Sequence, residues 1–122
     1  MIVGINGINI RSERKKILNS LIDLLIQKGF KIFISKELSK SFSNSKHKVY
    51  NDRTISNMDF IISFGGDGTL LNTVTNVGRK GIKILGVNVG KLGFLSFDVY
   101  DVFEKLIHDI QEDNYTLEKR TL

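Results

Sequence analysis

The sequence predicts an α/β fold in which crossover helices connect the strands of a parallel β-sheet. The first observation is that short apolar stretches alternate along the chain with longer segments whose apolar residues recur at helical spacing. The second is that two glycine-containing segments directly follow two of the predicted strands, at the ends where such sheets bind ligands. The third is size, since 122 residues with a hydrophobic fraction of 41% suit one globular domain.

The N-terminal half predicts two strands with a helix between them. Residues 1–7 and 30–34 form short apolar stretches, which are typical of buried strands. Between them, Ser12 is placed to cap a helix that Gly29 stops. The apolar residues of this segment fall at helical spacing: Ile17, Leu21, Leu24 and Leu25. Residues 35–57 are polar and poorly periodic, and we expect a loop there that carries one short helix.

The C-terminal half continues the alternation and ends on the start of another strand. In chain order we expect a strand over residues 59–64, a helix over 69–79, a strand over 82–87, a loop over 88–96, a helix over 99–113 and a strand over 115–122. Strands alternating with helices in this way predict a Rossmann-like parallel sheet with crossover helices. We expect a single α/β domain over residues 1–122.

The charge balance and composition exclude several classes of protein. The net charge is +5, but the basic residues are scattered and are not interleaved with aromatic residues that could stack on bases. No apolar run is long enough to span a bilayer, and the N-terminus lacks the pattern of a signal peptide. The chain has no cysteine, which excludes a disulfide framework and a thiolate metal site. We therefore expect a cytoplasmic protein that binds neither nucleic acid nor membrane.

The most informative segment is the glycine turn Gly65-Gly66-Asp67-Gly68-Thr69, which lies between a predicted strand and a predicted helix. Its glycines permit positive φ and let a phosphate approach the backbone without meeting a Cβ. An aspartate would repel that phosphate unless it had a chemical role, such as accepting a proton from a hydroxyl or holding a nucleotide's metal ion. The alternative is a plain turn in which Asp67 caps the next helix. The position at the carboxyl end of a strand favours a site.

A second glycine-containing segment follows the next predicted strand, with the sequence Gly-Val-Asn-Val-Gly-Lys-Leu-Gly-Phe-Leu over residues 86–95. It resembles the end of a Walker A motif but is one residue short, and Leu92 stands where a serine or threonine would follow the lysine. A Gly-x-Gly-x-x-Gly fingerprint is also absent, because Gly4 and Gly7 lie too far apart for its opening pair. The phosphate-binding device is therefore of another kind.

Together the two segments resemble the N-terminal part of an NAD kinase, and residues 115–122 are similar to the place where that family leaves its first domain. The likeness spans residue 58 to the C-terminus, whereas residues 1–57 agree in architecture only. The first motif is shared with diacylglycerol-type lipid kinases and, loosely, with phosphofructokinases. The second distinguishes NAD kinases, because lipid kinases carry a differently spaced Gly-Thr-Gly-Asn-type loop that this chain lacks.

The resemblance implies transfer of the γ-phosphoryl group of ATP to the 2′-hydroxyl of the adenosine ribose of NAD, which gives NADP. Asp67 matches the family's essential aspartate, whose implied role is to accept the proton of that hydroxyl. Mg²⁺ is the implied divalent metal, and it would arrive with ATP and neutralise charge on the phosphates. We assign no residue of this chain as a metal ligand.

The resemblance also implies a set of nucleotide-binding residues. Phe94 corresponds to the aromatic residue that lines the adenine site, with Leu95 beside it, although a core role is the alternative. Asn88 is expected either to hold its loop or to touch ligand, and Lys91 either to meet a phosphate or to lie in solvent. Asn72 stands where many family members have a basic residue facing the phosphates, so the cationic contact stays unassigned. The full predicted set is Gly65, Gly66, Gly68, Thr69, Leu71, Asn72, Asn88, Gly90, Lys91, Phe94 and Leu95.

The chain departs from the family in length. NAD kinases have a second, mostly β domain that carries an Asn-Glu or Asn-Asp pair for the substrate ribose, and this sequence stops before it. We therefore expect a fragment of a two-domain enzyme, with a half-built site and little or no turnover by itself. The family is commonly dimeric or tetrameric, which implies a homo-oligomer in the full-length protein. A lipid kinase domain and a non-catalytic nucleotide-binding module remain as alternatives.

Overall fold

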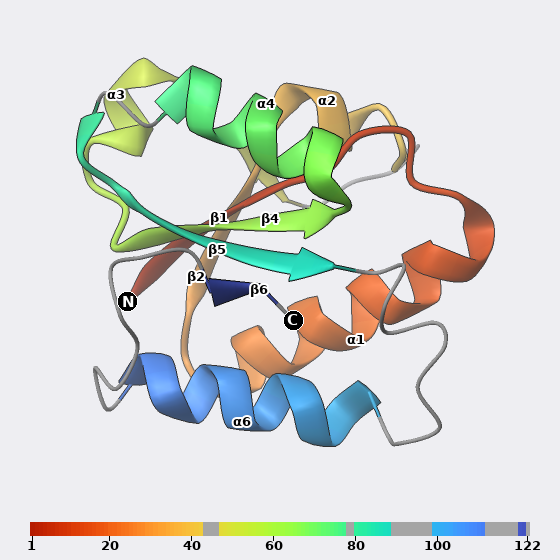
Figure 1. The fold of residues 1–122 in the computed structure, drawn as a ribbon. Coiled ribbons are helices and arrows are strands. Elements are labelled where there is room, and N and C mark those ends of the chain that lie inside the picture. The colour runs from red at the N-terminus through yellow and green to blue at the C-terminus, as the bar shows by residue number, and fades with distance from the viewer. Residues whose placement is uncertain (43–46, 78–79, 89–98, 112–119, 122) are drawn as a thin grey trace.

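The computed structural model describes residues 1–42, 47–77, 80–88, 99–111 and 120–121. These residues form a sheet of six strands in the order β3-β2-β1-β4-β5-β6 (Figure 1). All five strand pairs are parallel, which confirms the predicted sheet. The strands are β1 Ile2–Asn6, β2 Lys31–Ile34, β3 Lys48–Val49, β4 Phe60–Gly65, β5 Lys83–Asn88 and β6 Arg120–Thr121.

Helices cover both faces of the sheet, as an α/β fold requires. Figure 1 shows α1 and α6 below the sheet and α2, α3 and α4 above it. The helices are α1 Ser12–Gln27, α2 Lys36–Ser39, α3 Asp52–Ile55, α4 Asp67–Val77 and α6 Val99–Gln111. None of the helices in the described residues is long and apolar enough to cross a bilayer.

Strand β4 supplies side chains to the cores on both faces of the sheet. Phe60, Ile62 and Phe64 are fully buried in the larger core, which includes residues of α1 and α6. Ile61 belongs to the smaller core, with Val77 of α4. Side chains alternate between the two faces along a strand, so an apolar run such as this one reads as a strand buried on both sides. The glycine turn therefore directly follows a central, buried strand of the sheet.

Helix α1 confirms one predicted boundary signal and corrects the other. Gly29 follows the helix with a φ of 89°, so its lack of a Cβ permits the left-handed turn that was predicted to stop the helix. The N-cap is Arg11, which makes no side-chain capping bond, and Ser12 is already the first helical residue. The prediction that Ser12 caps the helix is therefore wrong.

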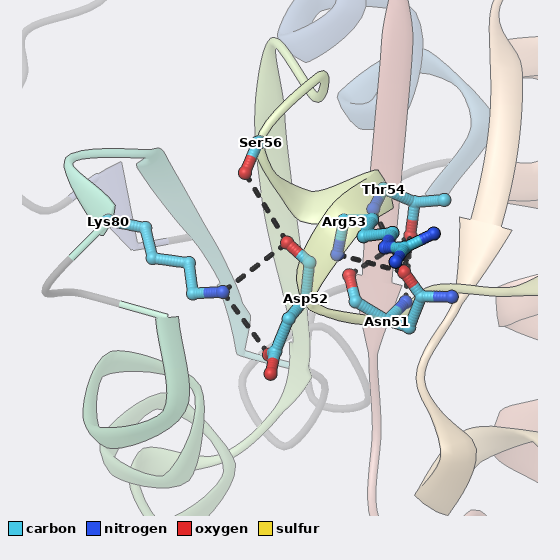
Figure 2. A network of polar contacts seen from close by, with 6 residues as sticks. All are labelled: Asn51, Asp52, Arg53, Thr54, Ser56 and Lys80. Carbon is cyan, nitrogen blue, oxygen red and sulfur yellow. Dashed lines mark hydrogen bonds and ion pairs between the residues drawn. The ribbon is translucent and has the colours of Figure 1, made fainter.

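The described parts of residues 35–57 contain more regular structure than the predicted loop with one short helix. The segment forms α2, β3 and α3. Ser35 caps α2 by accepting a bond from the Leu38 amide at 3.0 Å. Asn51 accepts bonds from two backbone amides of α3, and Thr54 Oγ1 accepts a bond from the Asn51 amide at 2.7 Å (Figure 2). The polar residues that suggested a loop are helix caps here, which is why the prediction was wrong.

Helix α3 is also tied to the segment between α4 and β5. The Lys80 Nζ lies 3.2 Å from Asp52 Oδ1 and donates to the Asp52 carbonyl oxygen at 3.4 Å (Figure 2). The Asp52 side chain is 93% exposed, so the ion pair itself contributes little stability. The contact instead links α3 to the segment between α4 and β5.

The register brings the carboxyl ends of three strands to one edge of the sheet. Asn6 of β1 pairs with Ser63 of β4, and Gly65 of β4 pairs with Asn88 of β5. The chain leaves β1 toward β2 on one side and leaves β4 toward β5 on the other. This reversal of direction is a topological switch point, where open parallel sheets bind ligands.

Candidate functional site

The glycine turn joins the central strand directly to the first turn of α4. The amide of Leu70 donates to the Gly66 carbonyl at 3.1 Å, which is the first bond of the helix. Helix α4 therefore begins at Asp67, two residues before the predicted start at Thr69. The backbone N–H groups of this first turn have no carbonyl one turn earlier to receive them. Such a helix N-terminus attracts anions.

The first glycine of the turn is required by packing. Gly65 has a φ of 154°, and a Cβ built on it would lie 2.5 Å from Thr69 Oγ1. Thr69 is buried, so its side chain closes the turn against the strand end. By contrast, a Cβ on Gly66 or Gly68 would meet nothing within 4 Å. Those two glycines leave backbone open on the surface, which suits the close approach of a ligand.

Asp67 is exposed at the start of α4. None of the other described residues bonds its carboxylate. A carboxylate is stabilised at the positive end of a helix dipole. Asp67 can therefore occupy this position although no ion pair with another described residue stabilises it. The alternative of a side-chain cap finds no support in the hydrogen bonds, because Asp67 lies inside the helix and Gly66 precedes it.

A small pocket lies where the end of β4, the start of α4 and the end of β5 meet. It brings together four of the predicted residues, namely Gly65, Gly66, Asp67 and Asn88. Its other lining residues were not predicted: Ser63, Leu70, Gly86 and Val87. They lie one or two residues from the predicted residues along the same three elements, and the parallel register is the signal that could have identified them.

The remaining predicted residues lie in different places. Thr69 is buried beneath the turn, and Leu71 points outward with 68% exposure. Asn72 is half-buried on the side of α4 that faces β1, and its Oδ1 accepts bonds from Asn6 at 3.1 Å and Asn76 at 3.2 Å. Four further predicted residues lie outside the described residues: Gly90, Lys91, Phe94 and Leu95.

Ser63 is a buried residue of the pocket with an unbonded hydroxyl. It is 2% exposed, and within the described residues its Oγ has no hydrogen-bond partner. Buried polar groups are normally bonded, so an unbonded one beside a pocket is notable. The hydroxyl is available to a ligand or to an ordered water in the pocket.

Replacing Ser63 by alanine tests whether its hydroxyl lacks a hydrogen-bond partner. A buried hydroxyl without a partner has lost its bonds to water, so we expect Ser63→Ala to raise the free energy of unfolding by about 1 kcal/mol. Urea unfolding of the chain measures the change. Ser20→Ala is the control on an exposed serine that bonds the Lys16 carbonyl, and it should change stability by no more than about 0.5 kcal/mol. A clear loss of stability in Ser63→Ala would show that the hydroxyl has a partner.

A second hollow lies on the other side of α4, over the ends of β1, β2 and β3. Its lining includes Asn6, Ser35, Tyr50, Asn72 and Asn76. Burial raises the pKa of Tyr50 to about 12, and a hydrogen bond with Ser35 opposes this rise. The phenol therefore stays protonated at neutral pH and remains able to donate a bond. One hollow thus lies at the N-terminal end of α4 and the other along its middle and C-terminal end.

A parallel sheet with an open glycine turn, an exposed carboxylate and a helix N-terminus at its carboxyl edge is an α/β domain of the kind that commonly binds nucleotides. The chain matches the ATP-NAD kinase N-terminal domain over residues 3–115, and it belongs to that family. This confirms the resemblance and extends it into residues 1–57, where the sequence suggested agreement in architecture only.

Curated relatives agree with this membership. The chain is 35% identical to an NAD kinase of Bacteroides fragilis over 108 residues, which cover 84% of the chain and 37% of the relative. It is also 35% identical to an NAD kinase of Clostridium kluyveri over 122 residues, covering 98% of the chain and 40% of the relative. For an NAD kinase of Flavobacterium psychrophilum the identity is 31% over 129 residues, covering 100% of the chain and 44% of the relative. The chain thus spans about two fifths of the length of these relatives.

Proposed function

We propose that the complete protein carrying this chain is an NAD kinase that converts ATP and NAD into ADP and NADP. The observation that carries the proposal is the exposed Asp67 carboxylate in the first turn of α4, which none of the other described residues bonds, beside backbone amides suited to phosphate. In the reaction the ribose 2′-oxygen forms a bond to the γ-phosphorus of ATP, and the bond from that phosphorus to the ADP oxygen breaks. Asp67 accepts the proton that leaves the hydroxyl.

Two features of this edge of the sheet suit the transfer of a phosphoryl group between two nucleotides. One hollow lies at the N-terminal end of α4 and the other along its middle and C-terminal end, so two ligands can lie beside this helix. Mg²⁺ enters this proposal with ATP, since it is usually held by one or two carboxylates together with substrate phosphates. Among the described residues, Asp67 is the carboxylate that lines the pocket, and we assign it to the hydroxyl proton rather than to the ion. The ion would supply charge neutralisation on the phosphates.

The proposed activity belongs to the complete protein. The chain spans about two fifths of its relatives, and the reaction needs both nucleotides held in place. We propose that the isolated 122 residues show little or no turnover. We also propose a cytoplasmic homo-oligomer as the working form, which follows from family membership. The relatives are named NAD kinases, which favours this reaction over a lipid kinase or a non-catalytic module.

An assay of the complete gene product with ATP, Mg²⁺ and NAD tests the proposal, with NADP detected by an NADP-specific dehydrogenase. We expect NADP to form, and no phosphorylation of diacylglycerol offered in place of NAD. Parallel reactions with polyphosphate for ATP and NADH for NAD define the donor and the acceptor. Absence of NADP, or phosphorylation of the lipid, would contradict the proposal. Normal NADP formation by the 122 residues alone would contradict the half-built site.

Gly68→Ala separates stability from ligand binding in the first turn of α4. A Cβ there meets nothing within 4 Å, and alanine favours helix, so we expect the ligand-free chain to gain about 0.5 kcal/mol of stability. The methyl group would stand where phosphate approaches the backbone, so we expect affinity for ATP to fall about tenfold in the complete protein. Urea unfolding and calorimetric titration measure the two effects. Unchanged affinity would show that phosphate does not approach this face.

A further inference from the structure

Helix α4 is seated on the sheet by an unusually polar stripe. Its buried residues are Thr69, Thr73 and Val77, and two of the three carry hydroxyls. Helix α1, in contrast, buries an apolar stripe of Leu18, Leu21, Ile22, Leu24 and Leu25. Apolar packing is not directional, whereas hydrogen bonds fix both distance and orientation. The half of α4 that begins with Asp67 is therefore seated through directional contacts.

Those contacts start from Asn6, the last residue of β1, which is 3% exposed. Its Nδ2 donates to Thr73 Oγ1 at 2.8 Å and to Asn72 Oδ1 at 3.1 Å. The Thr73 hydroxyl in turn donates to the Thr69 carbonyl at 2.8 Å. A buried chain of hydrogen bonds thus runs from β1 to the first turn of α4, close to Asp67. Buried hydrogen-bond networks of this kind rigidify the structure around them.

The same first turn is fixed from its other side by the strand that precedes it. Thr69 packs so closely on Gly65 that a Cβ there would lie 2.5 Å from its hydroxyl oxygen. The first turn of α4 is therefore held at Gly65 of β4 and, through Thr73, at Asn6 of β1. These two strands flank the switch point, so the link spans the crevice in which ligands bind.

We propose that Asn6 and Thr73 are positioning residues, which hold α4 at the angle that brings the Asp67 carboxylate to the reacting hydroxyl. This inference rests on the proposed kinase function. Displacement of a reacting group by about 1 Å can cost a factor of about 10² in rate. Loss of the link therefore lowers kcat while leaving the surfaces that bind the two nucleotides in place. A purely structural role would lower stability and leave the kinetics of the folded enzyme unchanged.

The chain offers a closely matched pair of threonines for the experiment. Thr73 and Thr75 lie on the same helix, and each donates to the carbonyl four residues earlier at 2.8 Å. They differ in that Thr73 is buried and accepts the bond from Asn6, whereas Thr75 is exposed. Valine replaces threonine with little change in shape, so Thr73→Val removes the link and Thr75→Val is its control. Thr73→Ser keeps the hydroxyl.

In the complete gene product we expect Thr73→Val to lower kcat about tenfold or more, with KM for ATP and NAD within about threefold of wild type. Thr73→Ser restores kcat to within about threefold, and Thr75→Val leaves it unchanged to within about twofold. The double variant with Asn6→Ala loses no more kcat than the worse single variant, because both residues act through one link. Unchanged kcat in Thr73→Val, or an equal loss in Thr75→Val, would overturn the inference.

A stability measurement separates this inference from the proposed function. The thermal unfolding midpoint of the double variant should fall by less than the sum of the falls in Asn6→Ala and Thr73→Val. Each single variant already removes the bond that the two residues share. If the wild-type protein forms no NADP, the proposed function fails while this coupling can still be observed. If NADP forms but the midpoints add and kcat is retained, the function stands and the positioning role is wrong.

Discussion

The Asp67→Asn variant of the complete protein should form NADP about 10²- to 10⁴-fold more slowly than wild type while still binding ATP and NAD. Asparagine has nearly the same shape as aspartate but cannot accept the proton of the ribose hydroxyl. Asp67 is exposed and bonded by none of the described residues, so the substitution should leave the fold intact. Steady-state rates give the loss in kcat, and calorimetric titration shows that nucleotide binding survives.

The matched control for this variant is Asp101→Asn. Asp101 is also exposed and also lies in the first turn of a helix, but that helix is α6, below the opposite face of the sheet (Figure 1). Any general effect of removing a carboxylate from a helix start is therefore shared by the two variants. Turnover of Asp101→Asn should stay within about twofold of wild type. Equal turnover of Asp67→Asn and wild type would refute the proton acceptor.

The Gly65→Ala variant should be the most destabilising single change in the glycine turn. The φ of 154° is one that alanine rarely adopts, and the new methyl group would overlap the buried Thr69 side chain. We expect the free energy of unfolding to fall by about 3 kcal/mol or more, since backbone strain and overpacking add. Urea unfolding of the chain, followed by circular dichroism, measures the loss.

Gly66→Ala is the control because it places the same methyl group one residue later, where it meets nothing within 4 Å. Its stability should remain within about 1 kcal/mol of wild type. A Gly65→Ala variant as stable as Gly66→Ala would mean that the turn relaxes easily. The first turn of α4 would then not be fixed by the strand end.

Features with a strong local signal were predictable from the sequence. The apolar run from Phe60 to Phe64 predicted a strand, and it is the central strand β4, which is buried along its whole length. The expectation that both glycine-containing segments start at one edge is confirmed where the structure describes them, because Gly65 pairs with Asn88. These predictions succeeded because hydrophobic pattern and strand direction alone determine them.

Features that depend on tertiary partners were not predictable. A lone asparagine at a strand end is common in turns, so nothing in the sequence distinguishes Asn6. Its proposed role depends on the bond that it donates to Thr73 of α4. Ser63 stands inside an apolar run, and its place in the pocket depends on the register between β4 and β5. The caps Ser35 and Asn51 resembled loop residues, because the same side chains favour turns and helix starts.

The position of β4 between two parallel neighbours has a consequence for how the domain moves. The strand is paired with β1 on one side and with β5 on the other along most of its length. Backbone in the middle of a sheet opens only when much of the domain unfolds. Asp67, the proposed proton acceptor, lies two residues beyond the end of this strand, and we expect substrate entry and product departure to rely on motion of other segments.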